Sequence, residues 1–260
     1  MTADDRRGPG PLVDYERAAG RYESGRALAD DTLDRWRAAV EGLAGAPPVA
    51  GARVLDLGAG TGIFSRAWLA WGAASVVAVE PASAMRGQAV ARDPASVAHV
   101  AGRAESLPVR PAAVDVAWLS TVVHHLADLQ TAVAELARVV RPGGAALVRN
   151  FMPDRGRAAV LDHMPPAGAA RARARMPSAA ALADAFTSGG FRAGGAADVT
   201  EVRRFDGAQG AAWVEAMRDA DTLLGALTPD EVEATKASLL AQADTPQPPG
   251  VISVLAFTRP

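Results

Sequence analysis

The chain has 260 residues, 49% of them hydrophobic, and a formal net charge of −2. This length allows one sizeable hydrophobic core, or one core with a small cap, and the slight acidic excess argues against a nucleic-acid-binding protein, which normally has a basic surface. The absence of cysteine excludes disulfides and thiolate metal sites. No stretch approaches the roughly 18 consecutive apolar residues of a transmembrane helix.

The first 48 residues divide into two predicted parts. Residues 1–12 are polar with several glycines and prolines, which predicts a disordered lead. They also lack the apolar centre of a secretory signal, so we expect a cytoplasmic protein. Residues 13–48 are predicted to be a helical cover, because apolar residues recur at three- and four-residue spacing. These residues are Leu33, Trp36, Val40 and Leu43. Gly45 and the two prolines after it end the pattern.

From residue 49 to residue 151, strand and helix signals alternate. Short apolar runs predict strands at 52–58, 75–80, 97–101, 113–120 and 145–151. Helical patterns are found at 62–72, 83–93 and 129–144. Strands that alternate with helices predict right-handed crossovers and a parallel sheet. The apolar character of the strands predicts burial on both faces of that sheet.

The pattern changes after residue 151. Residues 152–176 are rich in proline, alanine and arginine. The arginine-rich run at 171–175 is either an anion-binding patch or a solvated helix face. The net acidic charge of the chain favours the solvated helix face. The elements predicted after it are a helix at 178–188, a strand at 198–205, a helical segment at 208–242 and a last strand at 251–260.

A glycine-rich turn follows the first predicted strand. Residues 56–62 read Asp-Leu-Gly-Ala-Gly-Thr-Gly, which is neither the G-x-G-x-x-G fingerprint of dinucleotide sites nor a phosphate loop ending in Gly-Lys-Ser/Thr. Asp56 would repel a pyrophosphate and attract a cation. S-adenosylmethionine (SAM) carries an ammonium and a sulfonium and no phosphate, so the turn favours SAM over NAD.

Glu80 ends the second predicted strand, 18 residues after Gly62. An acid at this place can accept hydrogen bonds from the 2′- and 3′-hydroxyl groups of a ribose, as it does in NAD sites as well. The alternative is a solvated strand end without a ligand.

Five segments in order and spacing carry a resemblance to a known family. They are "VLDLGAGTG", "VVAVEPASAM", "GRAESLPV", "VDVAWLSTVVHHL" and "ELARVVRPGG", within about residues 50–150. The chain resembles class I SAM-dependent methyltransferases, in particular the small-molecule branch with ubiquinone- and menaquinone-type enzymes (methyltransferase type 11). The resemblance implies an α/β fold with a doubly wound, mostly parallel, seven-stranded Rossmann-like sheet whose last strand is antiparallel. Residues 49–260 would form the SAM-binding domain, with a helical acceptor cap at about 207–245 before the last strand.

The resemblance also implies cofactor-binding roles. The backbone at Gly58, Ala59 and Gly60 would line the methionine part of SAM, with Asp56 supporting its ammonium group. The other residues implied are Glu80 for the ribose, Met85 beside the adenine, Ala104 and Glu105 at the adenine edge, and Ser120, whose backbone would face the amino group. Many relatives have an aspartate where this chain has Arg103, which leaves the adenine amino contact open, with Glu105 as the substitute candidate.

The N-terminal segment offers candidates for both ligands. Either Tyr22 or Arg26 would bind the SAM carboxylate, a task suited to a guanidinium group. Tyr15 and Tyr22 are also predicted to contact the acceptor. The alternative is a solvated helix face on which two tyrosines pack.

His124 and His125 follow the fourth predicted strand, at the sheet edge where ligands of such folds bind. Either one is a candidate general base that removes a proton from the acceptor. Because adjacent side chains diverge, only one is expected to face the site. The alternative is that neither acts, since alignment alone can carry methyl transfer. His99 and His163 are interpreted as incidental, and no cluster has metal-ligand spacing.

Trp213 and Met217 are predicted to roof an apolar acceptor pocket, with ordinary helix packing as the alternative. The predicted function is SAM-dependent O-, N- or C-methylation of a small apolar or aromatic metabolite, in secondary metabolism. The alternatives are an RNA or protein methyltransferase and a non-catalytic SAM-binding protein. Apart from the small-molecule acceptor no partner is expected, neither nucleic acid nor membrane, and the protein is expected to be a monomer or homodimer.

Overall fold

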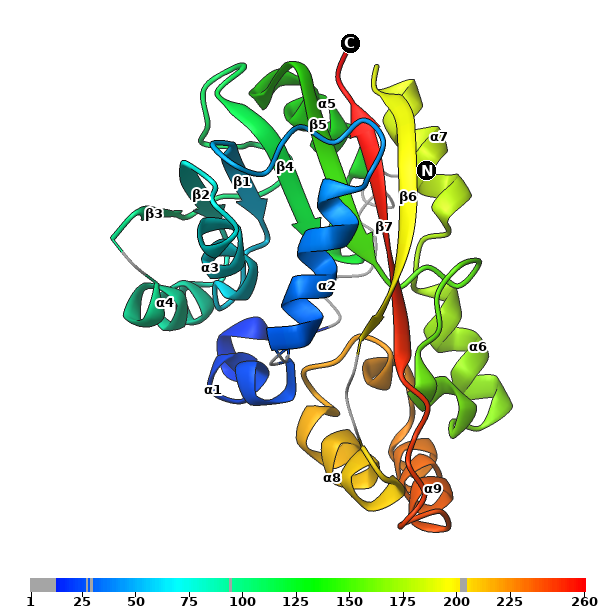
Figure 1. Cartoon of the computed structure of the whole chain (residues 1–260). Coiled ribbons are helices and arrows are strands. Elements are labelled where there is room, and N and C mark those ends of the chain that lie inside the picture. The colour runs from blue at the N-terminus through cyan, green and yellow to red at the C-terminus, as the bar shows by residue number, and fades with distance from the viewer. Residues whose placement is uncertain (1–12, 27, 29, 94, 202–204) are drawn as a thin grey trace, which may run out of the picture.

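Figure 1 shows the computed structural model of the chain, which describes residues 13–26, 28, 30–93, 95–201 and 205–260. The predicted lead at residues 1–12 lies outside the described residues. Among the helices of the described part, none is both long enough and apolar enough to cross a bilayer.

One seven-stranded sheet organises the molecule. Its strands are β1 (Arg53–Leu57), β2 (Ser75–Val79), β3 (Val97–Val100), β4 (Val114–Ser120), β5 (Val140–Asn150), β6 (Arg192–Glu201) and β7 (Gly250–Thr258). They lie in the order β3-β2-β1-β4-β5-β7-β6. Strands β1 to β5 pair in parallel, and β7 runs antiparallel to both β5 and β6. The predicted sheet with an antiparallel last strand is therefore confirmed.

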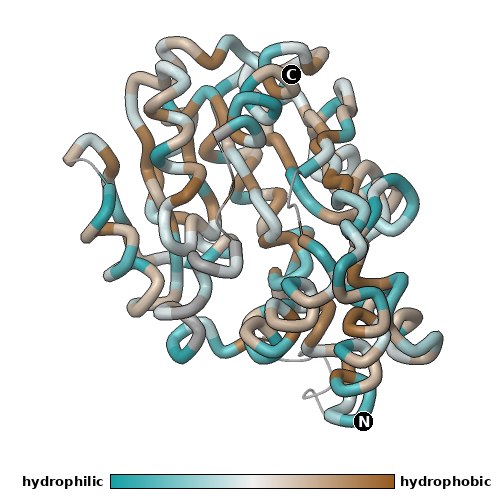
Figure 2. Tube along the Cα trace, turned by 60° about the horizontal axis from the view of Figure 1, so that its bottom comes forward, coloured by the Kyte–Doolittle hydropathy of each residue, from teal (hydrophilic) through white to brown (hydrophobic). Residues whose placement is uncertain are grey.

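Helices cover both faces of this sheet, as the alternation of elements predicted. The helices are α1 (Tyr15–Arg26), α2 (Asp30–Glu41), α3 (Ile63–Ala70), α4 (Ser83–Arg92), α5 (Leu129–Val139), α6 (Pro166–Ala174), α7 (Ala179–Ser188), α8 (Gly207–Met217) and α9 (Pro229–Leu240). One apolar core joins the sheet to α5 and α7 through Leu136 and Phe186, and a second joins it to α2 and α3 through Trp36 and Trp68. Figure 2 shows the apolar residues gathered along the strands and on the inner sides of the helices.

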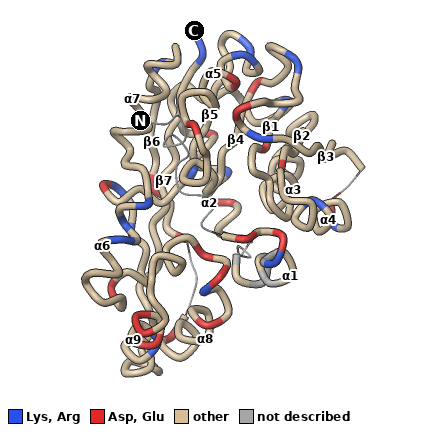
Figure 3. Tube along the Cα trace, turned by 180° about the vertical axis from the view of Figure 1, so that it is seen from behind, with Lys and Arg blue, Asp and Glu red and all other residues tan. Residues whose placement is uncertain are grey.

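A third apolar core forms a helical cap beside the sheet. It unites two segments that are far apart in sequence, one after β5 and one between β6 and β7. The first segment contains α6 and the short 3-10 helix η2 (Ala159–Asp162), and the second contains α8, α9 and the 3-10 helix η3 (Leu224–Ala226). The sequence predicted only the second segment as a cap. Helix α6 carries arginines and the charged residues of helix α9 are mostly acidic (Figure 3), and Arg171 of α6 pairs with Glu231 of α9, which agrees with a solvated helix face.

Several predicted boundaries differ from the structure; the strand predicted at 198–205, for example, begins at Arg192 as β6. The helix predicted for 129–144 ends at Val139, and β5 begins at Val140, so that the Pro-Gly-Gly segment belongs to the strand. Proline and glycine cannot continue a helix favourably, and Val140 pairs with Val114 of β4. The single helical pattern of residues 13–48 forms two helices, α1 and α2.

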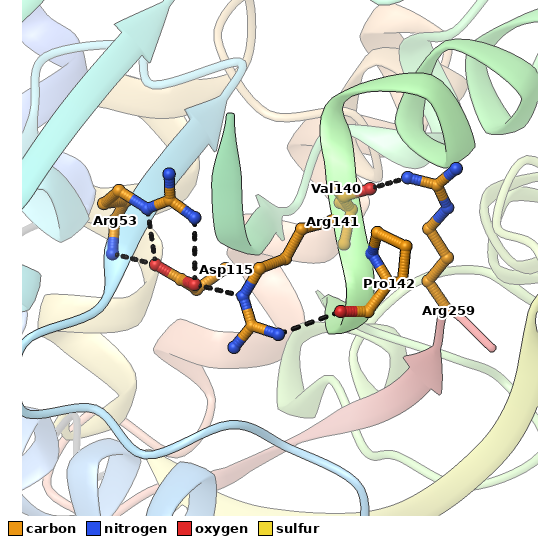
Figure 4. Close-up of polar contacts among 6 residues, drawn as sticks. All are labelled: Arg53, Asp115, Val140, Arg141, Pro142 and Arg259. Carbon is orange, nitrogen blue, oxygen red and sulfur yellow. Dashed lines mark hydrogen bonds and ion pairs between the residues drawn. The ribbon is translucent and has the colours of Figure 1, made fainter. Parts of the chain in front are cut away.

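A charged cluster ties together the strand ends on the edge of the sheet that faces away from the glycine turn. Asp115 accepts hydrogen bonds from the backbone and side chain of Arg53 and from the guanidinium of Arg141, as Figure 4 shows. Nearby, Arg259 donates to the carbonyl of Val140. The hydrogen bonds from Arg53 and Arg141 hold the pKa of Asp115 well below its usual range. This cluster therefore joins the amino ends of β1, β4 and β5 and lies outside the candidate site.

Candidate functional site

The glycine turn connects β1 to α3 at the carboxyl edge of the sheet. Gly58, Gly60 and Gly62 have φ angles of +69°, +56° and +81°, a left-handed region that favours glycine. Gly58 is also restricted by contact, because a Cβ atom there would lie 2.4 Å from Cγ2 of Val122. The turn is closed internally: the N–H groups of Gly58 and Ala59 donate to the carbonyl of Val79 at 2.8 and 3.2 Å.

A cavity lies beside this turn, and we call it the turn cavity. It is bounded by the carboxyl ends of β1, β4 and β5 and by parts of α1 and α3. Its lining residues are Tyr22, Leu28, Asp56, Gly58, Ala59, Gly60, Thr61, Ile63, Phe64, Ser120, Thr121, Arg149, Glu201 and Ile252. The structure thus brings together six of the predicted cofactor-binding residues. They are Tyr22, Asp56, Gly58, Ala59, Gly60 and Ser120.

Asp56 is a buried carboxyl group in the wall of the turn cavity. Its residue is 1% exposed, and Oδ2 accepts a hydrogen bond of 2.7 Å from the hydroxyl of Ser65. Burial raises the pKa of Asp56 to about 7, although the hydrogen bond from Ser65 lowers it, and the nearby carboxylates of Asp93 and Glu80 add to the rise. Its predicted contact with a ligand ammonium group stays a prediction.

Asp56→Asn is expected to change how stability depends on pH. The pKa of Asp56 is raised in the folded protein, so the folded state keeps a proton that the unfolded chain loses near pH 4. Stability of the wild type should therefore fall by about 1.4 kcal/mol per pH unit between roughly pH 4 and 7 through this group, and stay flat above. Urea unfolding at pH 5 and pH 8 measures the effect, and the asparagine variant should lack this fall.

The matched control for this experiment is Asp115→Asn, because the pKa of Asp115 is shifted downward. That variant should instead lose the stability that wild-type Asp115 contributes above pH 4. Equal pH dependence of the wild type and Asp56→Asn would contradict the assignment for Asp56.

Glu80 follows β2 and braces the glycine turn. Its residue is 7% exposed; Oε2 accepts from the N–H of Gly60 at 3.0 Å and Oε1 from the N–H of Ala82 at 2.9 Å. Burial raises the pKa of Glu80 against these two hydrogen bonds. The alternative of a solvated strand end is therefore wrong, and contact with a ribose stays a prediction.

The residues predicted for the adenine lie outside the lining of the turn cavity. Met85 and Ala104 are buried at 1% and 4% exposure. Oε1 of Glu105 accepts from the backbone N–H groups of Ala127 and Asp128 at 3.1 and 3.4 Å, at the start of α5. Arg26 ends α1, but its side chain lies outside the described part of the chain. The roles of these four residues stay predictions.

A second cavity, the cap cavity, lies between the sheet edge and the helical cap. It shares Thr121, Glu201 and Ile252 with the turn cavity, so the two are adjacent. The predicted residues in its lining are His124 and Trp213. Met217 is fully buried and packs against α1, where a Cβ atom on Gly25 would lie 2.1 Å from its Sδ. Met217 therefore takes part in ordinary helix packing, as the alternative predicted. Of the two residues predicted to roof the acceptor pocket, only Trp213 lines the cap cavity.

His124 belongs to a hydrogen-bonded chain that fixes its tautomer. The side-chain amide of Asn150 donates from Nδ2 to the carbonyl of Phe151 at 2.7 Å, so its oxygen faces Nδ1 of His124 at 3.1 Å. An oxygen of this kind only accepts, and Nδ1 therefore carries the hydrogen. In the neutral ring, the lone pair then lies on Nε2, which is 3.2 Å from the hydroxyl of Thr222.

The two histidines converge, and the prediction that they diverge is wrong. Nε2 of His125 lies 3.3 Å from the hydroxyl of Thr222, the group that also contacts His124, and 2.6 Å from the hydroxyl of Tyr15. The two rings have centroids 4.1 Å apart. The pair belongs to a 3-10 helix, η1 (Val123–His125), in which successive side chains are about 120° apart and not opposed as in a strand.

Helix α1 contacts both halves of the site. The carboxylate of Glu16 accepts from the N–H groups of Ser83 and Ala84 at 2.6 and 2.8 Å, at the start of α4. At the other end of α1, the carbonyl of Gly25 accepts from Nε1 of Trp213 at 3.1 Å. Together with the contact between Tyr15 and His125, these bonds place α1 across the turn cavity and the edge of the cap.

Four candidate functional residues that line the two cavities were not predicted from the sequence. Arg149 and Asn150 end β5, and a polar pair after an apolar strand is the same signal that identified Glu80. Thr222 and Glu201 gave no such signal, because their positions depend on how the cap and β6 pack against the rest of the chain.

Comparison with known proteins matches residues 55–148 to a family described as "Methyltransferase domain". The chain is 39% identical over 133 residues to malonyl-[acyl-carrier protein] O-methyltransferase from Serratia marcescens, which covers 51% of this chain and 49% of that protein. It is 35% identical over 138 residues to demethylmenaquinone methyltransferase from Beutenbergia cavernae, which covers 53% of this chain and 56% of that protein. The chain therefore spans about half the length of these two curated relatives.

Solved structures share the fold over nearly the whole chain. The [4+2]-cyclase SpnF has a TM-score of 0.63 at 20% identity and covers 97% of this chain and 98% of that chain. A putative methyltransferase from an antibiotic biosynthesis pathway of Anabaena variabilis has a TM-score of 0.62 at 22% identity, with 85% and 96% covered. Because one of these proteins is named a cyclase, the reaction has to be argued from the site.

Proposed function

We propose, on the premise that residues 55–148 form a class I SAM-dependent methyltransferase domain, that this protein transfers a methyl group from SAM to a small acceptor in the cap cavity. The observation that carries the proposal is the junction of the two cavities. Thr121, Glu201 and Ile252 line both of them, so a group bound at the glycine turn and a group bound under the cap would meet there. Methyl transfer needs such a close and aligned approach above all.

The glycine turn fits a ligand without phosphate. The N–H of Gly60 donates to Glu80, those of Gly58 and Ala59 donate to Val79, and that of Gly62 donates to the carbonyl of Ala59. A phosphate at a glycine-rich turn would need such N–H groups for itself. The lining of the turn cavity includes Asp56, Glu201 and Arg149, so it offers charged groups of both signs to a ligand that carries an ammonium and a carboxylate group. SAM meets both conditions and supplies an electrophilic methyl group on its sulfonium when bound.

In the proposed mechanism, His124 is the general base. Its Nε2 carries the lone pair and would take the proton from an acceptor O–H or N–H as the methyl group arrives, while Asn150 holds the ring by its hydrogen bond to Nδ1. Thr222 lies between His124 and His125, and we assign His125 and Tyr15 to positioning this hydroxyl.

The cap cavity supports an apolar or aromatic acceptor. Its apolar lining includes Phe151, Val160, Met176, Phe205, Trp213, Leu223, Leu239 and Ile252. Polar side chains line it as well, among them His124, Asn150 and Thr222. Such a mixture suits an apolar body that carries one ionisable O–H or N–H group. We place this reaction in secondary metabolism, in a cytoplasmic monomer or homodimer.

Two measurements test this proposal. Titration calorimetry should show binding of SAM and of S-adenosylhomocysteine, and no binding of NAD. Transfer of a labelled methyl group should then be seen with members of a panel of phenols, quinols and aromatic amines. Binding of NAD alone would overturn the cofactor assignment, and binding of SAM without transfer to any acceptor class, RNA and protein included, would favour a non-catalytic SAM-binding protein.

Glu80→Ala is expected to weaken the binding of S-adenosylhomocysteine by about 1.5–3 kcal/mol, the range of hydrogen bonds to a charged group. The reason is its buried carboxylate beside Gly60, next to the turn cavity. Calorimetry measures the loss. The matched control is Glu135→Ala, which removes a carboxylate that also accepts from a backbone N–H, that of Leu107 at 2.7 Å, but outside both cavities. If Glu80→Ala binds S-adenosylhomocysteine as tightly as the wild type, Glu80 only stabilises the glycine turn and does not contact the ligand.

A further inference from the structure

A buried ion pair forms part of the wall between the two cavities. Arg149 lies near the end of β5 and Glu201 ends β6, and the two residues are 5% and 9% exposed. Nη2 of Arg149 donates to Oε1 of Glu201, and this oxygen also accepts from Nε1 of Trp36 at 3.1 Å. Burial of such a pair adds little net stability, because both charges lose their hydration. The burial of this pair therefore points to a role other than stability.

The guanidinium group of Arg149 has more N–H donors than its hydrogen bonds within the protein use. It carries five N–H hydrogens; one bonds to Glu201 and one, from Nη1, to the hydroxyl of Ser120 at 2.9 Å. Its buried Nε has no acceptor within reach among the described residues. The group is held in place by aromatic rings, since its carbon Cζ lies 4.7 Å from the ring centroid of Trp36 and 5.0 Å from that of Phe64. An unmet donor on a buried charge is costly and would be satisfied by an anionic ligand.

We propose that Arg149 and Glu201 bind the amino-acid end of the cofactor. The guanidinium group takes the carboxylate and the carboxylate of Glu201 takes the ammonium group. Both side chains line the turn cavity beside Gly58 and Ser120. This inference rests on the proposed function, because it presupposes that SAM occupies that cavity.

The pair explains how a low-dielectric wall accepts a ligand end with two opposite charges. Before binding, the two side chains neutralise each other. After binding, each faces an opposite charge on the ligand, so that no single charge is left buried without a partner. Of the residues first predicted for these tasks, Asp56 has a pKa raised to about 7 by burial, which makes it a weaker partner for an ammonium group at neutral pH. Arg149 and Glu201 supply both charges from the carboxyl ends of β5 and β6, the two strands that flank β7.

The experiment compares ligands that differ only at the amino-acid end. S-adenosylhomocysteine has both charges, its decarboxylated analogue has only the ammonium group, and 5′-methylthioadenosine has neither. Arg149→Met should weaken S-adenosylhomocysteine about 10- to 100-fold, as expected for charged hydrogen bonds, and leave the two other ligands within about twofold. Glu201→Gln should weaken S-adenosylhomocysteine and the decarboxylated analogue and spare 5′-methylthioadenosine. Calorimetry gives the affinities, and tryptophan fluorescence gives a second readout, because Trp36 contacts both side chains.

Controls separate binding from folding. Arg155→Met removes an arginine whose guanidinium also pairs with an acid of β6, Asp198 at 3.1 Å, but away from both cavities, and should change no affinity. If Arg149→Met lowers the melting temperature strongly, Arg149→Lys is the second variant, with a smaller loss that again spares 5′-methylthioadenosine, because lysine keeps the charge but not the planar fork. Equal loss for all three ligands, or no loss for any, would overturn the inference. Failure of the wild type to bind S-adenosylhomocysteine would instead contradict the proposed function.

Discussion

His124→Gln is expected to lower turnover by about 10²–10⁴-fold, the usual contribution of a general base. Glutamine can keep hydrogen bonds of the kind that His124 makes to Asn150 and Thr222, but it cannot take a proton. The affinity for S-adenosylhomocysteine should stay nearly unchanged, because His124 lines the cap cavity and not the turn cavity. Turnover with any acceptor found in the transfer screen is the measurement, with calorimetry and melting temperature beside it.

Three further variants make this result specific. His125→Gln should cost only a few-fold, since its ring bonds to Tyr15 and Thr222 and lies outside the cavity lining. Asn150→Ala should lower turnover in part, because Nδ1 of His124 then loses the acceptor that fixes the tautomer. His99→Gln is the control, a histidine on an outer strand. Near-full turnover in both His124→Gln and His125→Gln would mean that alignment alone carries the reaction.

Gly58→Ala is expected to lower the free energy of unfolding by about 2–5 kcal/mol. The left-handed backbone costs an alanine about 1–2 kcal/mol, and overpacking adds about 1–3 kcal/mol. The overpacking arises because the new Cβ would lie 2.4 Å from Cγ2 and 2.9 Å from Cβ of Val122, a side chain with little rotamer freedom. Binding of S-adenosylhomocysteine should fall as well, since the turn shifts. Denaturant unfolding measures the stability.

Gly60→Ala is the matched variant, two residues along the same turn. Its φ angle is +56°, but an added Cβ would meet only Cε1 of Tyr22, at 4.0 Å, which is ordinary contact. Only the backbone cost of about 1–2 kcal/mol should remain. Equal stability of the two variants would show that contact with Val122 does not restrict residue 58.

The sequence predicted the sheet well because its signals are local. Each strand from β1 to β5 contains an apolar run, and periodic helical patterns separate most of these runs. The end of α5 was predicted too late, since apolar residues continue through Val139 and Val140 without a break and the pairing of Val140 with β4 decides the boundary. Helix α6 gave no clear pattern, because its stability comes from packing against η3 and α9 in the cap.

The residues of the site that could be predicted are those in the glycine turn or directly after a strand. The residues around Gly58, as well as Glu80, Ser120 and His124, could be placed from their position after buried strands. The geometry of the histidine pair could not, because it depends on η1 and on Thr222, 98 positions from His124 in sequence. Arg149 and Glu201, 52 positions apart, meet only because β5, β7 and β6 lie side by side.

The separate apolar core of the cap bears on how this protein can evolve. That core shares no buried member with the two cores of the sheet, and its segments are inserted after β5 and between β6 and β7. Substitutions that reshape the acceptor side can therefore accumulate there while the strand pairing that supports the glycine turn stays intact. Acceptor preference can in this way change in evolution without a change in cofactor binding. Paralogues would therefore diverge first in residues 152–176 and 205–248.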